Sequence, residues 1–279
     1  MSNVTLTAAM RSNLLSLQGI QKNMDITTGR LATGKKVNSA LDNAGNFFAS
    51  QSVNFRANDL TGRLDGIGQA IQTLKAADQG ITSMSSTLEQ MRALAQEALD
   101  QANAAGGGTN APADQTSLEN NFDALRTQFA SYANDAGYRG TNLLAGGSQT
   151  VVFNEDGSDT LAITGVNYDL ANGGTGITLA NADFSDASTI QASIAELDQA
   201  INDLRAQART FGTNLTTLQT REEFTKNMIN TLKEGSDKLV LADQNEEGAK
   251  LLSLQTAQQL GVTSLSLASQ AQQSILRLF

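Results

Sequence analysis

The chain of 279 residues contains no cysteine, no histidine and no tryptophan, and it has a single proline. Without cysteine it can form neither a disulfide nor a thiolate nucleophile. Without histidine it lacks the imidazole that serves most often as an acid–base catalyst and a common zinc ligand. These absences exclude most enzyme designs, so we expect no catalytic activity, no metal site and no cofactor.

Long hydrophobic runs are also missing. No apolar segment approaches the roughly 20 residues that span a bilayer, so we expect no membrane insertion. Residues 1–20 mix apolar with polar side chains, which is not typical of a cleaved secretory signal. The net charge is -9 with a pI near 4.5, and no basic cluster counters it locally. Such a surface repels phosphates, so nucleic acid is not an expected partner.

What is present is an apolar stripe at each end of the chain. The N-terminal stripe falls on alternating steps of four and three residues: Met10, Leu14, Leu17, Gln21, Met24, Thr28 and Leu31. The C-terminal stripe keeps the same rhythm: Leu251, Leu254, Gln258, Gly261, Leu265, Ala268, Gln272, Ile275 and Phe279. Each stripe is too narrow and too often polar to be stable alone. We therefore expect the two ends to pack on each other or on copies of themselves, as in an elongated assembly subunit.

The middle of the chain has two longer helical patterns and one strand pattern. Apolar residues from Leu60 to Ala95 sit seven apart and predict a helix over about 50–103, roughly 80 Å long. A shorter helix around 118–129 should run back against it, and Ile190 to Leu232 predicts a second long helix. The strand-rich segments 150–153 and 160–164 predict a hairpin turning near Asp156-Gly157, with one more short strand at 177–179.

The expected fold is therefore mainly α, a long antiparallel helical bundle or coiled coil formed by both chain ends, with a small central β-hairpin. We expect an inner terminal-helix domain made of residues 1–43 and 238–279. Residues 44–237 should form an outer helical rod that carries the hairpin at about 148–166. A polar connection over 33–45 and an acidic one over 243–248 should separate the two layers.

One motif carries a family resemblance. Residues 30–45 have the sequence RLATGKKVNSALDNAG, which resembles the RLSSGxRINSAxDDAAG pattern of bacterial flagellins. Residues 94–98, 138–144 and 255–261 support the resemblance, which covers roughly 1–145 and 188–279. The variants at 34–37 and 42–43 look most similar to alphaproteobacterial flagellins. The short middle implies that the large variable outer domains are missing.

The resemblance implies a structural subunit that polymerises into the flagellar filament for swimming motility. It implies a secreted, extracellular protein that leaves through the type III export apparatus with a secretion chaperone. Its partners would be further copies, possible sibling flagellins, and the hook-associated and cap proteins. The hairpin would influence how neighbouring subunits stack.

Two sets of residues are assigned on this basis. The inner-layer packing residues are Leu14, Leu17, Met24, Leu31, Leu254, Leu265, Ile275 and Phe279. The connection between the layers uses Arg30, Gly34, Asn38, Ser39 and Asp42, and the last three have the side chains that satisfy backbone groups in turns.

Innate immune receptors recognise two flagellin segments that are altered here. Residues 88–95 resemble a family segment LQRVRELA that is read by Toll-like receptor 5. Gln90 and Ala93 replace an Arg and a Glu of that segment, whereas Arg92 and Leu94 match it. In the plant-recognised segment, Leu41 replaces a basic residue and Asn43 an Asp. Each change removes a charge-assisted contact, so we expect weak or absent sensing, and a reporter-cell response at low protein concentration would contradict this.

Several alternatives stay open from the residues. Periodicity alone fits a monomeric coiled coil as well as an assembly subunit. A hook-filament junction protein or a cell-surface flagellin homologue with a binding role would share the terminal helices. An enzyme or ligand-binding bundle would need a convergent polar cluster that the sequence does not indicate. The acidic turn at 154–159 lacks the spaced ligands of an EF-hand, and Gly173 to Gly176 lacks the context of a phosphate loop.

Overall fold

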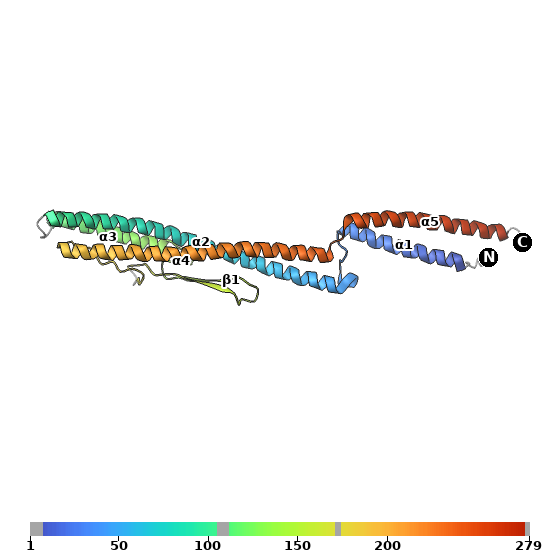
Figure 1. Ribbon diagram of the computed structural model, residues 1–279, viewed down its shortest axis with the longest axis horizontal. Coiled ribbons are helices and arrows are strands. Elements are labelled where there is room, and N and C mark those ends of the chain that lie inside the picture. The colour runs from blue at the N-terminus through green and yellow to red at the C-terminus, as the bar shows by residue number, and fades with distance from the viewer. Residues whose placement is uncertain (1–7, 105–111, 171–173, 277–279) are drawn as a thin grey trace. The chain divides into compact units, whose positions relative to one another are not determined.

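The computed structural model describes residues 8–104, 112–170 and 174–276 (Figure 1). The elements follow in the order α1 Ala8–Thr33, α2 Ala40–Ala104, α3 Pro112–Asp135, β1 Ser148–Val152, β2 Thr160–Thr164, α4 Ala187–Val240 and α5 Gln244–Leu276. The fold is mainly α with one antiparallel hairpin, which confirms the expected fold class. Among the described residues, no helix combines the length and the hydropathy needed to cross a membrane.

The chain divides into two compact units. The first contains the described residues of Met1–Ala57 and Asn230–Phe279, and the second contains those of Asn58–Ile229. Helices α2 and α4 therefore contribute to both units, whereas α1 and α5 belong only to the first.

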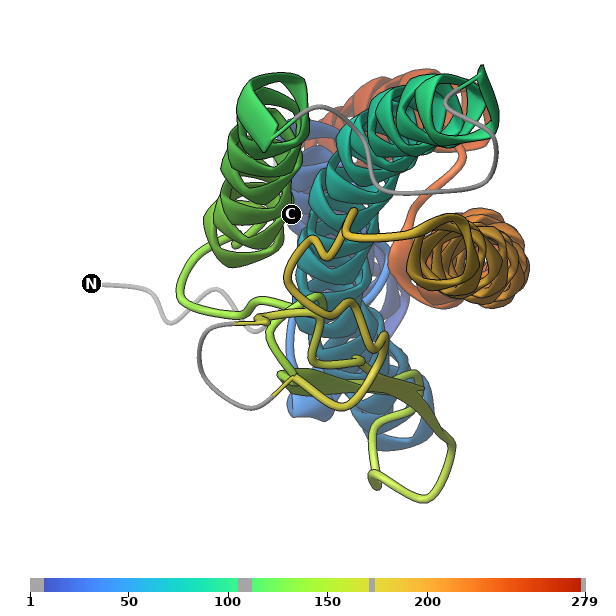
Figure 2. The same cartoon turned by 90° about the vertical axis from the view of Figure 1, so that its left-hand side faces the viewer.

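The second unit has one continuous apolar core. Side chains of α2, α3 and α4 fill it together with the loops around the hairpin. Seen from one end, α2 lies beside both α3 and α4, with the hairpin to one side (Figure 2). Fully buried core residues recur at heptad positions along the long helices: Ile67, Leu74, Leu88, Ala95, Ile190, Leu197, Leu204, Phe211 and Leu218. The predicted seven-residue spacing thus faces the core.

Helix α2 begins earlier than predicted, at Ala40 rather than near residue 50. Asn43 interrupts it with extended backbone angles, φ -163° and ψ 100°. The Asn43 Oδ1 accepts a hydrogen bond of 3.0 Å from the Asn46 N–H, so Asn43 is the N-cap of the uninterrupted part of α2 that follows. The sequence-based prediction missed this start because the residues before Val53 lack an apolar stripe on the predicted face.

The hairpin pairs Ser148 with Thr164 and Val152 with Thr160. Its connection contains Gly157 at φ 78°, a left-handed angle that suits glycine, so the predicted turn at Asp156-Gly157 is confirmed. The further strand expected at 177–179 is wrong. This segment is irregular, although Ile177 and Leu179 are buried. The Leu179 carbonyl accepts a hydrogen bond from Arg126 Nε at 2.9 Å, so a side chain takes the place of a strand partner.

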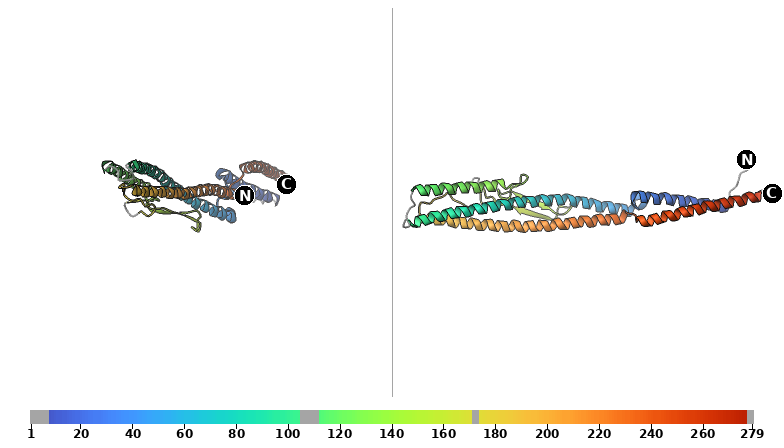
Figure 3. Two further views of the ribbon diagram at one scale, coloured as in Figure 1. Left: turned by 60° about the vertical axis from the view of Figure 1, so that its left-hand side comes forward. Right: turned by 90° about the horizontal axis from the view of Figure 1, so that it is seen from above.

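In the first unit, α1 and α5 run side by side (Figures 1 and 3). They are antiparallel, because contacts join the start of α1 to the end of α5 and the end of α1 to the start of α5. The inward positions of α5 follow the predicted spacing from Leu251 to Ala268. The predicted acidic connection over 243–248 is shorter and lies earlier in the chain, since only residues 241–243 separate α4 from α5 and Gly248 lies inside α5.

The inward face of α1 differs from the predicted stripe at every second position. Met10, Leu17, Met24 and Leu31 face α5 as expected. Between them the buried or half-buried positions are Asn13, Ile20 and Thr27, rather than Leu14, Gln21 and Thr28. This one-residue rotation buries Ile20 in place of Gln21, at the expense of Leu14, which is 40% exposed.

Candidate functional site: the paired terminal helices

Helices α1 and α5 come close together where Leu17 lies over Gly261. A Cβ atom added at Gly261 would stand 2.7 Å from Leu17 Cδ2, so only glycine leaves room for the leucine in this position. Polar contacts flank this point. Gln258 Nε2 donates to Gln21 Oε1 at 2.8 Å, and the Asn13 amide reaches Ser264 Oγ at 3.5 Å. We call the line of contact between α1 and α5 the seam. At this point of the seam, Leu17 packs against Gly261, and a polar side-chain pair lies on either side.

An ion pair lies at the other end of the same seam. Arg30 Nη1 donates to Glu247 Oε1 at 2.8 Å. The Glu247 side chain is only 9% exposed, whereas Arg30 is 31% exposed. The hydrogen bond from Arg30 holds the pKa of Glu247 below its usual value of 4.5, although desolvation acts in the opposite direction. The neighbouring Thr27 hydroxyl also lowers the pKa of Glu247, but by less than Arg30 does, so Arg30 carries most of the compensation for this buried carboxylate.

The connection after α1 is held by backbone and carboxylate hydrogen bonds. Asp42 Oδ2 accepts hydrogen bonds of 2.9 Å from the N–H groups of Asn38 and Ser39, and these bonds lower the pKa of Asp42. Gly34 adopts φ 70°, which turns the chain out of α1. Its carbonyl accepts from the Ala242 N–H at 2.9 Å. The connection is therefore tied directly to the segment between α4 and α5.

Much of the surface of α1 and α5 is apolar and uncovered in the single chain. Leu15, Leu252, Leu260 and Leu267 are between 62% and 68% exposed, and Val262 is 55% exposed. No charged residue lies between Lys250 and Arg277. One seam covers one stripe of each helix and leaves these side chains to water, which is unfavourable for so many leucines on two helices.

The sequence-predicted residues fall in different places. Leu17, Met24, Leu31, Leu254 and Leu265 are half-buried in the seam, and Leu14 lies beside it. The side chain of Ile275 and the whole of Phe279 lie outside the described residues. Sequence reasoning did not single out Glu247 or Ile20, although a carboxylate at a helix start and an isoleucine one position from the stripe were available signals.

The residues of the two segments that resemble receptor-recognised flagellin segments are mostly at the surface. Leu41 is 98% exposed, and Asn43 is exposed beside its N-cap hydrogen bond. On α2, Gln90, Arg92 and Ala93 are exposed and Leu94 is half-buried. Arg92 Nε pairs with Asp198 Oδ1 of α4 at 2.7 Å, so its guanidinium already has a partner within the chain.

Arg221 of α4 contacts the hairpin at the surface. Arg221 Nη2 lies 2.9 Å from Asp159 Oδ2, and its guanidinium carbon lies 4.9 Å from the centre of the Phe153 ring. We expect Arg221→Gln to increase hydrogen exchange and protease cleavage in residues 148–164. Global stability should change by about 1 kcal/mol or less, because both contacts are near the surface.

The control for this prediction is Lys226→Gln. It removes an ion pair with Glu222 that lies within α4 and does not touch the hairpin. Equal exchange rates in the hairpin of the two variants would contradict the role given to Arg221.

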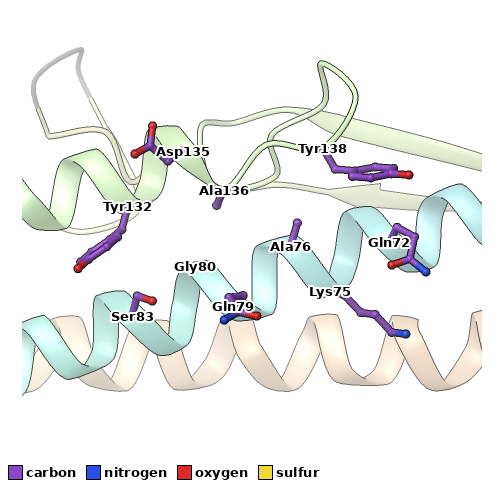
Figure 4. A pocket seen from close by; sticks show the side chains of 10 residues that line it. All are labelled: Gln72, Lys75, Ala76, Gln79, Gly80, Ser83, Tyr132, Asp135, Ala136 and Tyr138. Atoms are coloured by element: carbon purple, nitrogen blue, oxygen red, sulfur yellow. The ribbon is translucent and has the colours of Figure 1, made fainter.

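The second unit contains an open hollow of about 440 Å³ between α2 and the end of α3 (Figure 4). Tyr132 and Tyr138 lie at its two ends, and Tyr138 Oη donates to Gln69 Oε1 at 3.2 Å. Below them Gly80 lies so close to Ala136 that an added Cβ would stand 2.7 Å from the Ala136 Cβ. The hollow has no nucleophile paired with a base. Among the described residues, no group of three or more carboxylates could hold a metal ion.

The geometry therefore defines a class of protein, a helical subunit whose first and last helices pair and leave apolar faces uncovered. The comparisons identify the family. The model of the bacterial flagellin N-terminal helical region matches residues 2–149, and that of the C-terminal helical region matches residues 194–279. The chain belongs to the bacterial flagellins, the structural subunits of the flagellar filament.

Similar proteins cover nearly the whole chain. Flagellin FljM of Caulobacter vibrioides is 32% identical over 95% of both chains. Flagellin FljK of the same organism is 29% identical over 100% of this chain and 99% of its own. A solved protein from Vibrio parahaemolyticus, described as a flagellar hook-associated protein, has a TM-score of 0.58 over 72% of this chain and 100% of its own, at 13% identity. That likeness concerns the fold alone, and nothing favours the hook-junction alternative over a filament flagellin.

Proposed function

We propose that copies of this chain build the filament by burying the faces of α1 and α5 that the seam within one chain leaves open. The observation that carries the proposal is the set of leucines exposed by more than 60% on α1 and α5. Burying a leucine contributes about 1.5 to 3 kcal/mol, so a few such contacts outweigh the entropy cost of association between subunits that each meet several neighbours. The proposed inner-layer residues are Leu14, Leu17, Met24, Leu31, Leu254, Leu265, Ile275 and Phe279.

The proposal assigns a role to each part of the chain. Residues 1–43 and 238–279 form the inner layer, and residues 44–237 form the outer rod with its hairpin. The connection residues Arg30, Gly34, Asn38, Ser39 and Asp42 fix how the chain passes from one layer to the other. Because the open faces would aggregate before assembly, they need a covering partner inside the cell.

The proposed partners follow from this need. A secretion chaperone covers α5 until the chain leaves through the flagellar export apparatus, and the protein then functions outside the cell. Hook-associated proteins and cap proteins limit the polymer at its ends. Caulobacter vibrioides has several flagellins similar to this chain, which supports filaments of mixed sibling subunits.

The test is seeded polymerisation of the purified chain, with Leu260→Ser and Gln259→Ser compared with the wild type. Both positions are exposed on α5, but only Leu260 presents apolar surface. We expect Leu260→Ser to raise the critical concentration at least tenfold, since even the lower value of about 1.5 kcal/mol per leucine corresponds to about one factor of ten in affinity. Gln259→Ser should remain close to the wild type. Equal critical concentrations for the two variants would contradict the proposed faces.

A further inference from the structure

A second open apolar face lies on the first part of α2, within the first unit. We define the Phe48–Phe55 face as Phe48, Ser52 and Phe55. The two rings are 59% and 60% exposed, and Ser52 lies between them at the surface. At 100° per residue, residues 48, 52 and 55 fall within about 60° of one another on the helix. The face is therefore a single apolar strip rather than two scattered rings.

This face points away from the packed side of α2. Ser50 and Ala57 are buried, and Ser50 Oγ lies 2.9 Å from Ser236 Oγ of α4. Phe48 precedes Ser50 by two residues, which places it about 200° around the helix. More than half of the surface of each ring thus stays uncovered in the single chain. Exposed phenylalanines are costly to keep in water, and two on one strip indicate a contact surface.

The ring of Phe48 already packs against a neighbouring ring. Phe47 is half-buried, and its ring meets that of Phe48 edge to face, with centroids 5.5 Å apart and an angle of 77°. A ring that already has a packing neighbour has fewer rotamers to lose when a partner binds it.

The distribution of charge along the chain favours a second copy of this chain as the partner. The chain carries a net charge of -9, so two copies repel each other except where both present uncharged surface. No charged residue lies between Asp42 and Arg56, so the strip is uncharged along its whole length. A second copy offers matching surface on α5, which is uncharged from residue 251 to residue 276. We propose that the Phe48–Phe55 face packs against a second copy of this chain in the filament, an inference that rests on the proposed function.

The first test compares critical concentrations in seeded polymerisation. We expect Phe48→Ser combined with Phe55→Ser to raise the critical concentration at least tenfold, and Phe48→Leu combined with Phe55→Leu to stay within about threefold of the wild type. Phe224→Ser is the matched control. Phe224 is 54% exposed, but it lies among Glu222, Glu223 and Lys226 and should have little effect. An equal rise in critical concentration for Phe224→Ser would overturn the inference that uncharged surroundings make the Phe48–Phe55 face a contact between copies.

The second test needs no change in the rings and does not depend on how the serine variants fold. Because the chain has no cysteine, Ser52→Cys introduces a unique thiol in the middle of the face. Alkylation by iodoacetamide should be at least tenfold slower in filaments than in the soluble subunit. Equal rates in both states would overturn the inference and leave the face to a partner other than this chain. A wild-type chain that forms no filaments would instead contradict the proposed function, and the inference would fall with it.

Discussion

A chain shortened to end at Ser264 is expected to form no filaments. The deletion removes Leu265 from the seam and Leu267 from the open face of α5. It also ends α5 at the Asn13–Ser264 contact, so the helix no longer continues along the first turns of α1. Neither terminal stripe is wide enough to stay helical alone, so the ends lose order together. Seeded samples viewed by negative-stain electron microscopy should show only the seeds.

The second unit should survive this deletion. Its core is built from α2, α3, α4 and the hairpin region and takes nothing from α5. The main thermal transition followed by circular dichroism should therefore keep its midpoint within a few degrees. The matched control is full-length Gln270→Ser, which changes an exposed polar residue in the same segment and should form normal filaments. Normal filaments from the shortened chain would contradict the role of the end of α5 in assembly.

Replacing Arg30 with Met should detach α1 from α5. The change leaves the Glu247 carboxylate, 9% exposed, without the guanidinium that now lies 2.8 Å away. Removing one partner of a buried ion pair costs roughly 3 kcal/mol, at the lower end of the range because Arg30 is itself about a third exposed. Hydrogen exchange in α1 should therefore accelerate by about a hundredfold in the soluble subunit.

Two comparisons make this prediction specific. Lys22→Met removes an exposed cation from the same helix and should leave exchange in α1 unchanged. The double change Arg30→Met with Glu247→Met removes both charges and should recover most of the lost protection, because no buried charge is left unpaired. If Arg30→Met behaves like Lys22→Met, the ion pair does not hold the seam.

The same pair gives a pH dependence. The pKa of Glu247 is lower in the folded chain than its usual 4.5, because Arg30 donates a hydrogen bond to the charged form. The unfolded chain therefore binds the proton first as the pH falls, and the stabilisation present above about pH 4.5 is lost below it, through the lowered pKa. Protection of α1 should be constant from neutral pH to about 4.5 and then decline. Glu247→Gln should remove this step.

The sequence predicts the helical architecture well for physical reasons that the structure makes visible. The heptad positions of α2 and α4 are apolar on one side only, so their period fixes which face enters the core. The hairpin follows from strand-forming residues on both sides of Asp156-Gly157, whose glycine takes the left-handed angle. The stripe of α5 can be recognised in the sequence because Gln258 and Gly261, which interrupt its apolar residues, keep its spacing.

The parts that could not be predicted depend on partners far away in the sequence. The rotation of α1 exchanges Leu14 for Asn13 and Gln21 for Ile20, a choice decided by contacts with α5 rather than by the α1 pattern. The need for glycine at position 261 follows only from Leu17 across the seam. In the same way, a lone Glu247 in the sequence looks like a favourable helix-start charge. Its burial against Arg30 requires the folded pair.

We propose that the apolar faces left open on α1 and α5 are the contacts between copies. Helical reconstruction by electron cryo-microscopy of filaments grown from the purified wild-type chain tests it most directly. We predict that Leu15, Leu252, Leu260 and Leu267 are buried against neighbouring subunits. Filaments in which these leucines face solvent, with the copies joined only through α2, α3 and α4, would contradict it.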